Sequence, residues 1–203
     1  MRTSTFALPF LLLLSITSFS QDKEENIVTD VTKLTFLNPG ISYEKAIGKF
    51  QTLYGQAFMN TSISYSYSSS LGTNSDISFD PALALQYRYY FNFKRREQAG
   101  KRTEMNNLNY IAPAFQTYFS KGGVASDYYN EEKRRAITTI GALWGIQRNY
   151  PKRFSLDLNL GIGYLFTKGT TLNNAGEVVK KNIGLVTGLG QLNLGFWLNN
   201  RSR

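Results

Sequence analysis

The sequence predicts an all-β protein: a single antiparallel, up-and-down transmembrane β-barrel of eight strands that follows a cleaved signal peptide. Apolar and polar residues alternate over segments longer than the ordinary soluble strand of about 5–6 residues. Aromatic residues gather near the ends of the apolar faces, as in the interfacial girdles of membrane barrels. Short turns also alternate with longer polar loops, which is typical of outer-membrane barrels.

The clearest strand runs from Arg153 to Thr167. Every second residue is apolar and the residues between are mostly small or polar, so a strand here has one apolar and one polar face. The apolar face consists of Phe154, Leu156, Leu158, Leu160, Ile162, Tyr164 and Phe166. A tilted transmembrane strand needs about 9–11 residues, and this face is long enough to cross a bilayer.

Residues 1–20 are predicted to be a secretory signal peptide. Arg2 supplies the positive start, residues 6–16 are mainly apolar, and Ser18 and Ser20 place small residues before the cleavage point. The apolar run is shorter than the ~20 residues of a transmembrane helix. The chain is therefore divided into a signal peptide at 1–20, a flexible lead-in at 21–30 and an outer-membrane barrel at 31–203.

Residues 26–47 are predicted to hold the first two strands. Asn38-Pro39-Gly40 interrupts the alternation there with turn-forming residues. Without a turn at this point the chain shows seven strands, whereas bacterial single-chain barrels have an even number. We therefore expect two strands joined at Asn38-Pro39-Gly40.

Six further strands are predicted at 51–68, 81–93, 108–120, 135–148, 153–167 and 182–198. The expected connections are short turns at 48–50 and 149–152, polar loops at 69–80, 121–134 and 168–181, and a basic link at 94–107. Pro113 lacks an N–H and suggests a bulge. The apolar positions of the last strand change phase, and Gly190-Gln191 is the expected bulge that absorbs the extra residue.

Alternation does not show which face is buried, and a soluble lipocalin-like barrel points its apolar side chains inward. Lipid on the outside is favoured because the polar faces carry Gly, Ala, Ser, Asn and Gln, which fit a narrow lumen. Aromatic residues at the strand ends favour the same arrangement. We therefore expect the protein in the cell outer membrane, surrounded by outer-membrane lipids, with the soluble barrel as the alternative.

Several short segments resemble the small outer-membrane β-barrel proteins common in Bacteroidota. They are YEKAIG at 43–48, LQYRYYFN at 85–92, GKRT at 100–103, GIQRNY at 145–150 and LNLGIGY at 158–164. The resemblance covers residues 31–198 and depends on the combination of these segments. It implies a barrel fold and an outer-membrane location, and it implies no established activity.

The composition excludes several kinds of chemistry. The 203 residues include no Cys and no His, which removes disulfides, thiolate nucleophiles, the usual zinc ligand and the commonest general base. Acidic residues of the predicted outer loops could bind a divalent cation, but the spacing of Asp76, Asp80, Asp127, Glu131 and Glu132 matches no metal-binding motif. We expect no catalytic residue, no metal, no cofactor and no enzyme activity.

Arg88, Asp157 and Glu44 are predicted to face the lumen, because their apolar neighbours point the other way. A buried charge is costly unless it is paired. These residues are therefore candidates for an ion pair, and Asp157 is the expected partner of Arg88. A structural network that fills the lumen is the expectation, and a gate or ion path is the alternative.

The formal net charge of +9 is concentrated partly at one predicted end of the barrel. The basic candidates at this periplasmic edge are Lys94, Arg95, Arg96, Lys101, Arg102, Arg148, Lys152 and Arg153, with Arg201 and Arg203 at the same end. They are expected to contact anionic phospholipid headgroups, with a periplasmic or cell-wall partner as the alternative. A signal peptide makes nucleic acid an unsuitable partner, and we expect none.

These observations predict a small integral outer-membrane β-barrel protein with a side-chain-filled lumen and a structural or interaction role in the cell envelope. A narrow pore or small-solute channel is the first alternative. A His-independent envelope enzyme and a soluble lipocalin-like binding barrel are the others.

Overall fold

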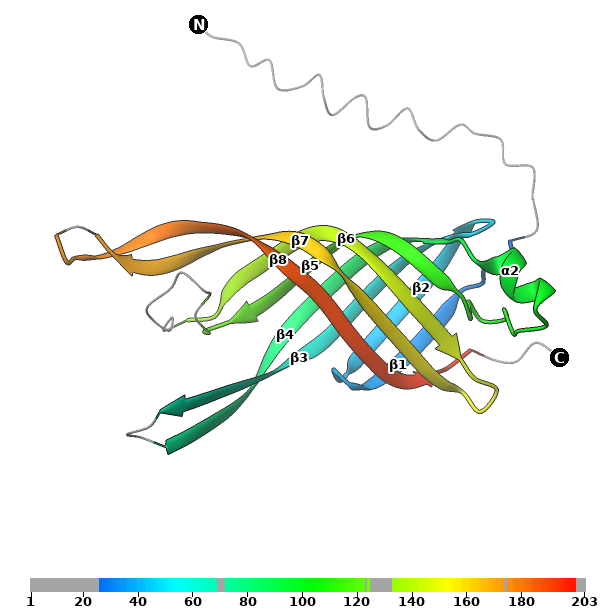
Figure 1. Ribbon diagram of the computed structural model, residues 1–203, viewed down its shortest axis with the longest axis horizontal. Coiled ribbons are helices and arrows are strands. Elements are labelled where there is room, and N and C mark those ends of the chain that lie inside the picture. Colours follow the sequence, from blue (N-terminus) through cyan, green and yellow to red (C-terminus); the bar gives the residue numbers. More distant parts are fainter. Residues whose placement is uncertain (1–25, 69–71, 123, 125–132, 174, 200–203) are drawn as a thin grey trace, which may run out of the picture.

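The computed structural model describes residues 26–68, 72–122, 124, 133–173 and 175–199, and the side chains within these ranges except at 62–77. Eight antiparallel strands form a closed barrel in which each strand pairs with its sequence neighbours and β8 pairs with β1 (Figure 1). The strands are β1 (Val31–Leu37), β2 (Gly40–Gly48), β3 (Gln51–Ser68), β4 (Gly72–Tyr90), β5 (Asn109–Ser120), β6 (Arg135–Asn149), β7 (Phe154–Leu172) and β8 (Val178–Trp197). The predicted all-β, eight-stranded, up-and-down barrel is confirmed.

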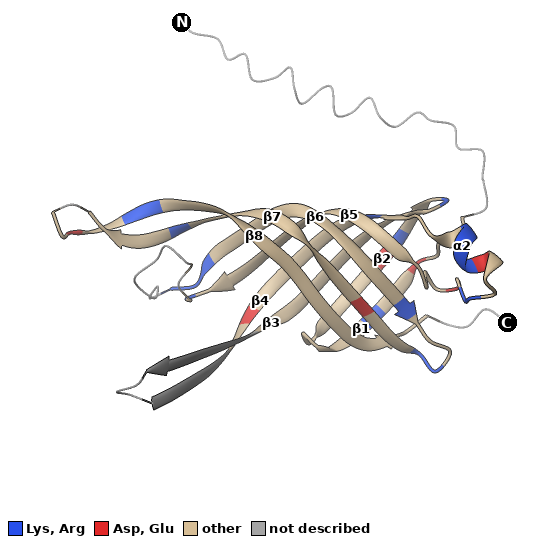
Figure 2. Ribbon diagram, in the orientation of Figure 1, with Lys and Arg blue, Asp and Glu red and all other residues tan. Residues whose placement is uncertain are grey.

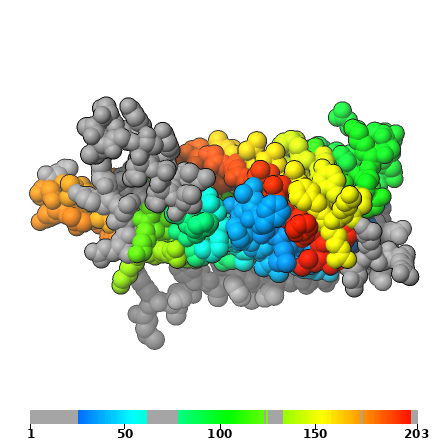
Figure 3. All heavy atoms as spheres, turned by 90° about the horizontal axis from the view of Figure 1, so that it is seen from below, coloured from blue at the N-terminus to red at the C-terminus, as the bar shows by residue number. Residues whose placement is uncertain are grey.

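The two ends of the barrel differ. One end carries the short helix α2 (Phe93–Gln98) and the β6–β7 turn, and we call it the α2 end. At the opposite end the β7–β8 hairpin, orange in Figures 1 and 3, extends beyond the neighbouring strands, and we call it the long-hairpin end. Within the described ranges, no helix has the length and apolar character needed to cross a membrane.

The first two strands form a hairpin, as predicted, although β1 begins at Val31. The turn between them places Asn38 at a φ of 54°, a left-handed conformation that Asn tolerates better than most residues. Gly40 then lies so close to β3 that a Cβ atom would meet the carbonyl oxygen of Ala57. The turn residues therefore satisfy both the chain reversal and the close approach of the next strand.

The predicted loops at 69–80 and 168–181 are too long. β4 already begins at Gly72, and β7 and β8 pair continuously out to Leu172 and Val178. Polar residues were expected to leave the sheet there, but an antiparallel hairpin satisfies its own backbone donors and acceptors whatever its side chains. Polar composition alone therefore did not mark the end of these strands.

Neither predicted bulge is present. The β7–β8 register runs without interruption from Phe154↔Phe196 to Leu172↔Val178, so Gly190-Gln191 absorbs no extra residue. Pro113 pairs with Ala142 on β6, and the β4–β5 register is the same on both sides of it. The register shifts between Thr35 and Leu37 and between Ala46 and Gly48 instead.

The phase change in β8 has a different cause. Ile183 is 8% exposed and lies on the inward face with Asn193, whereas Val186 is 67% exposed. Inward positions of β8 are thus apolar at Ile183, Leu185 and Leu189 and polar at Gln191 and Asn193. Leu143 and Leu165 also point inward and are buried, so apolar side chains fill part of the lumen.

Large apolar side chains cover the outside of the barrel. Each strand contributes at least one that is 47% to 67% exposed. In order from β1 to β8 these are Leu34, Ile41, Leu53, Leu85, Ile111, Ile140, Leu160 and Val186. Hydrogen-bonding side chains occupy the inside near the α2 end. Each strand contributes at least one that is at most 3% exposed. In order from β1 to β8 these are Lys33, Glu44, Thr52, Arg88, Tyr110, Gln147, Asp157 and Asn193. This facing agrees with the alternation in the sequence.

Residues 27–30, which were expected to belong to a flexible lead-in, are held at the α2 end. Val28 is 2% exposed and packs in a cluster with Tyr90, Leu108 and Tyr110. The side chain of Asn106 bonds the backbone N–H and carbonyl of Thr29, both at 2.8 Å. These residues therefore pack against the barrel, because the open end of the lumen offers an apolar surface that Val28 covers.

Candidate functional site

Four charged side chains meet inside the barrel near the α2 end. They are Arg88 on β4, Asp157 on β7, Glu44 on β2 and Lys33 on β1, and none is more than 2% exposed. Each lies between two residues that face outward, so the alternation of its strand directs it into the lumen. The three lumen candidates of the sequence are thus brought together, with Lys33 added. We call these four residues the charged cluster.

Arg88 is the centre of the cluster. Its Nη1 donates to Asp157 Oδ2 at 2.8 Å and to Gln147 Oε1 at 2.6 Å, and its Nε donates to Gln86 Oε1 at 2.8 Å. The guanidinium carbon lies 3.7 Å from the ring centre of Tyr54 and 4.2 Å from that of Tyr110. Aromatic faces on a desolvated cation offset part of the cost of burying it.

The two carboxylates also accept several hydrogen bonds each. Glu44 Oε1 accepts from the hydroxyls of Thr52 at 2.7 Å and Tyr90 at 2.5 Å, and its Oε2 accepts from Gln147 Nε2 at 3.1 Å. Asp157 Oδ1 accepts from the Tyr110 hydroxyl at 2.8 Å. Hydrogen bonds of this kind replace the water that each carboxylate loses on burial.

Lys33 balances the charge. Its Nζ donates to Gln147 Oε1 at 2.7 Å and lies 3.9 Å from Glu44 Oε2 and 3.8 Å from Asp157 Oδ2. Two cations and two anions therefore share one buried volume. A balanced, hydrogen-bonded set of charges is tolerated inside a protein, whereas a single unpaired charge there costs several kcal/mol (roughly 3–5 for one partner removed).

The cluster spans the lumen from wall to wall. Gln147 on β6 contacts Lys33 on β1, Arg88 on β4 and Glu44 on β2. In a ring of eight strands β6 and β2 lie opposite each other. Side chains therefore occupy the lumen at this level, as expected for a barrel whose interior is just wide enough to be filled.

Gly145 makes room for this packing. It lies on the inward face of β6, and a Cβ atom there would fall 2.2 Å from the ring carbon Cζ of Tyr110. The Tyr110 hydroxyl that bonds Asp157 therefore crosses the space that any larger residue would take. A glycine in a strand interior commonly marks a site of close approach of this kind.

The basic edge residues lie together at the α2 end, on α2, the segment after it, the end of β6 and the β6–β7 turn (Figure 2). Three are engaged locally. Arg96 donates to the carbonyl of Arg102 at 3.0 Å, Arg102 donates to Glu104 at 3.2 Å, and Arg148 donates to the carbonyl of Leu108 and to Asn109. The exposed members of the set are Lys94, Arg95, Lys101, Lys152 and Arg153.

Arg148 differs from the expectation for an exposed edge. It is half-buried and makes three hydrogen bonds, two of them to backbone carbonyls. It joins the end of β6 to Leu108 and Asn109, where β5 begins. Its function in the structure is therefore to hold the α2 end together. Arg201 and Arg203 lie outside the described residues.

Asp80 was expected in an outer loop, but it lies in β4, faces inward and is 5% exposed. Its Oδ1 is 3.7 Å from Arg134 Nε. Asp127, Glu131 and Glu132 lie outside the described residues, as does the side chain of Asp76. Among the described residues, no group of three or more acidic side chains is arranged to hold a metal ion.

Asp30 forms a second polar contact outside the lumen. Its carboxylate accepts hydrogen bonds of 2.8 Å from Tyr43 Oη, Lys45 Nζ and the backbone N–H of Ala46. Burial opposes ionisation, but the hydrogen bonds from Lys45 and Ala46 outweigh it and lower the pKa of Asp30 below its ordinary value. The charged form of Asp30 therefore fastens the chain before β1 to β2.

Sequence reasoning missed Lys33, Gln147 and Tyr110 as parts of the site. Leu34 and Phe36 are apolar and lie on one face of the strand 31–37, and Lys33 lies on the other face. The alternation in the sequence therefore already directed Lys33 inward. Nothing in the local pattern, by contrast, indicates that Gln147 touches Lys33, Arg88 and Glu44. That contact depends on the relative heights of four strands.

The chain was compared with protein-family models, with curated proteins and with solved structures, and none of the three comparisons finds a match.

Proposed function

We propose that this chain is a small integral outer-membrane β-barrel protein whose lumen is filled by side chains and which has a structural or interaction role in the cell envelope. The observation that carries the proposal is the outer surface of the barrel. Every strand presents at least one large apolar side chain that is 47% or more exposed, while Lys33, Glu44, Arg88 and Asp157 point inward. This is the reverse of a soluble barrel.

Physical chemistry favours lipid around such a surface. Contiguous exposed apolar patches beyond a few hundred Å² are rare on monomeric soluble proteins. A closed barrel also satisfies all of its strand hydrogen bonds, which hydrocarbon requires because it offers no water to unpaired groups. The predicted signal peptide at 1–20 supports export to the envelope.

The ends of the barrel support an orientation. Membrane barrels have short periplasmic turns and longer outer connections. Two of the three connections at the α2 end are short, 49–50 and 150–153, and 91–108 is the long exception. In this proposal the α2 end is therefore the periplasmic side, and the protruding β7–β8 hairpin is on the cell surface. The exposed basic residues Lys94, Arg95, Lys101, Lys152 and Arg153 then lie next to anionic phospholipid headgroups. A periplasmic or cell-wall partner at the same edge is the alternative.

The filled lumen favours a structural or interaction role over transport. A channel needs a water-filled path, whereas the Arg88, Gln147 and Glu44 contacts cross the lumen and leave these side chains fully buried. The absence of His and Cys from the sequence also removes the residues on which most hydrolytic sites depend.

Membrane fractionation tests the proposal. We expect the mature protein in the outer-membrane fraction, released by detergent and not by high salt. On gels run without boiling it should migrate faster than the heated sample, because the folded barrel is compact. A protein recovered in the soluble periplasmic fraction without detergent would contradict the proposal.

A further inference from the structure

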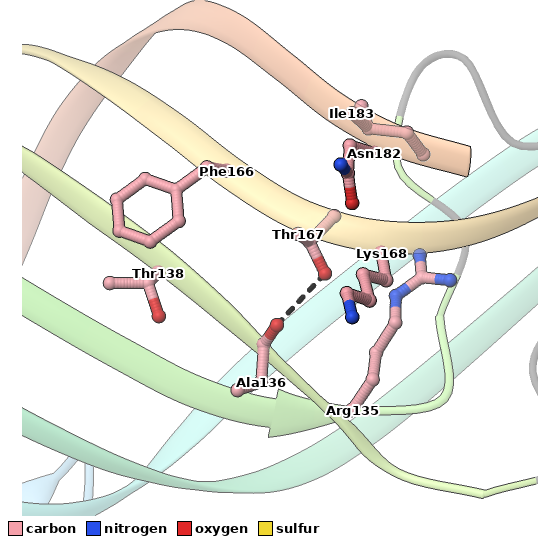
Figure 4. Close-up of a pocket in the computed structure, with 8 residues that line it drawn as sticks. All are labelled: Arg135, Ala136, Thr138, Phe166, Thr167, Lys168, Asn182 and Ile183. Carbon is pink, nitrogen blue, oxygen red and sulfur yellow. Dashed lines mark hydrogen bonds between the residues drawn. The ribbon is translucent and has the colours of Figure 1, made fainter. Parts of the chain in front are cut away.

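A pocket of about 580 Å³ lies at the long-hairpin end, between β6, β7 and β8 (Figure 4). The residues that determine its chemistry are Arg135, Ala136, Thr138, Phe166, Lys168 and Asn182. It is separate from the charged cluster, which lies near the α2 end. None of the residues that line it is acidic.

The pocket lies where the outer surface changes from apolar to cationic. Along the outward face of β7 the residues Leu160, Ile162, Tyr164 and Phe166 are 43% to 62% exposed, and the next outward residue is Lys168. On β8 the corresponding change runs from Val186 to Asn182 and Lys180. In a membrane barrel this change marks the boundary between hydrocarbon and headgroups.

The apolar part of the pocket lies where the pairing of β6 with β7 ends, and residues of both the outward and the inward face line the pocket there. Thr138 pairs with Phe166 across β6 and β7, and Ala136 is the next outward residue of β6. The Thr138 hydroxyl lies 3.1 Å from that of Thr117 and is thus already engaged. A hydrogen bond of 2.8 Å from Thr167 Oγ1 to the carbonyl of Ala136 joins the two strands at this level.

The polar part of the pocket is cationic. In the view of Figure 4 the Lys168 and Arg135 side chains lie on one side of the pocket, and Phe166 and Thr138 lie on the other. Arg135 Nη2 donates to the carbonyl of Gly122 at 3.2 Å, which holds the guanidinium at the rim. Lys180 and Lys181 are exposed nearby on β8. Charge and apolar surface are thus separated across one pocket.

We infer that this pocket binds a phosphorylated lipid of the outer leaflet, with its phosphate at Lys168 and Arg135 and an acyl chain against Phe166, Ala136 and Thr138. The inference rests on the proposed membrane function, since only a barrel in a bilayer meets a lipid at this height. Lys and Arg both bind phosphate strongly, and Arg does so with a planar fork. A free phosphate would use only the polar half of the pocket.

Native mass spectrometry of the detergent-solubilised full chain tests the inference. The probe is lipid A carrying two phosphates, compared with dephosphorylated lipid A and with inorganic phosphate. We expect the phosphorylated lipid to remain bound, and a Lys168→Gln variant to weaken its binding about tenfold, because a hydrogen bond to a charged group is lost. Ala136→Trp should reduce binding as well, because it fills the apolar part without changing the charge.

Lys121→Gln is the matched control, since Lys121 is exposed at the same end, does not line the pocket and carries the same charge. Equal losses in Lys121→Gln and Lys168→Gln, or equal retention of the phosphorylated and dephosphorylated lipids, would overturn the inference. Equally strong binding of inorganic phosphate would overturn the lipid part of it.

Insertion of each sample into lipid vesicles is measured first, by the difference in gel migration between unheated and heated protein. A protein that inserts but does not distinguish the lipids contradicts the pocket alone. A protein that does not insert contradicts the proposed function as well.

Discussion

Arg88 illustrates how this barrel accommodates a charge in its interior. The side chain is fully buried, yet one carboxylate, two amide oxygens and two aromatic faces surround it. Its Nη2 makes no hydrogen bond among the described residues. The guanidinium is therefore stabilised by several contacts. The carboxylate of Asp157 is the oppositely charged group within 3 Å of it.

Removing Arg88 should cost more stability than removing Arg88 and Asp157 together. Arg88→Met leaves two carboxylates facing Lys33 alone, and we expect a loss of about 3–5 kcal/mol in the free energy of unfolding. The double variant Arg88→Met, Asp157→Asn should recover part of that loss, because the net charge of the cluster returns to zero.

Urea titrations of folding into lipid vesicles measure all four corners of this double-mutant cycle. A coupling free energy of at least about 1 kcal/mol is expected for residues in direct contact. Additive effects of the two substitutions would show that the ion pair does not contribute to stability.

On the scale of a single strand, β7 separates two environments with a period of two residues. Leu160 is 55% exposed on the outer face, and its neighbour Asn159 is 2% exposed in the lumen. In the proposed membrane setting, Leu160→Arg places a cation in hydrocarbon and should cost about 2–4 kcal/mol. Asn159→Ser keeps a small polar group in the lumen and should change stability little.

Folding of both variants into vesicles of one lipid composition provides the comparison. The two substitutions affect adjacent residues of one strand. Differences in strand propensity are therefore small compared with the effect of whether the side chain faces the outside or the lumen. Similar losses for both would contradict the assignment of the outer face to lipid.

The chain segment before β1 provides a pH-dependent contact at the α2 end. The pKa of Asp30 is lowered in the folded state, so its stabilising effect is complete above the ordinary aspartate pKa of about 3.9 and is lost as the pH falls through the lower folded value. Asp30→Asn should therefore reduce stability modestly at pH 7, because an exposed ion pair contributes little.

Thermal unfolding of wild type and Asp30→Asn at pH 7 and at pH 2.5 checks this expectation. The difference in melting temperature between the two proteins should shrink at the acidic pH, where the wild-type carboxyl also approaches its neutral form. A difference that stays constant would show that hydrogen bonding to the neutral side chain, and not charge, holds the segment in place.

The whole molecule combines an apolar exterior with a closed interior. At the α2 end Val28, Tyr90, Leu108 and Tyr110 pack across the opening, and the charged cluster lies above them. Ions would need to displace these side chains to pass. We therefore expect no discrete conductance steps from the purified protein in planar lipid bilayers.

A porin in the same bilayer serves as the positive control for insertion and recording. Discrete openings of the wild-type protein would favour the narrow-pore alternative over a filled lumen. Steady silence after verified insertion would agree with a structural or interaction role.

Local periodicity accounts for most of what could be predicted about the fold. Alternation with a period of two places Arg88 on the other face of its strand from Tyr87 and Tyr89. It places Asp157 on the other face from Leu156 and Leu158 in the same way, without knowledge of any partner strand. The turn at Asn38-Pro39-Gly40 is also local chemistry. The inward direction of the charged residues followed from the sequence for this reason. The strand number followed from this turn together with the even number of strands in bacterial single-chain barrels.

Contacts between strands required the folded barrel. The length of β4, β7 and β8 depends on which polar segments find a partner, and the absence of bulges at Pro113 and Gly190 depends on the register of the neighbouring ladder. Gln147 meets Lys33, Arg88 and Glu44 only because the stagger of the strands brings these residues to one height. Periodicity within a strand specifies the face of a residue, whereas its height relative to other strands is set by their pairing.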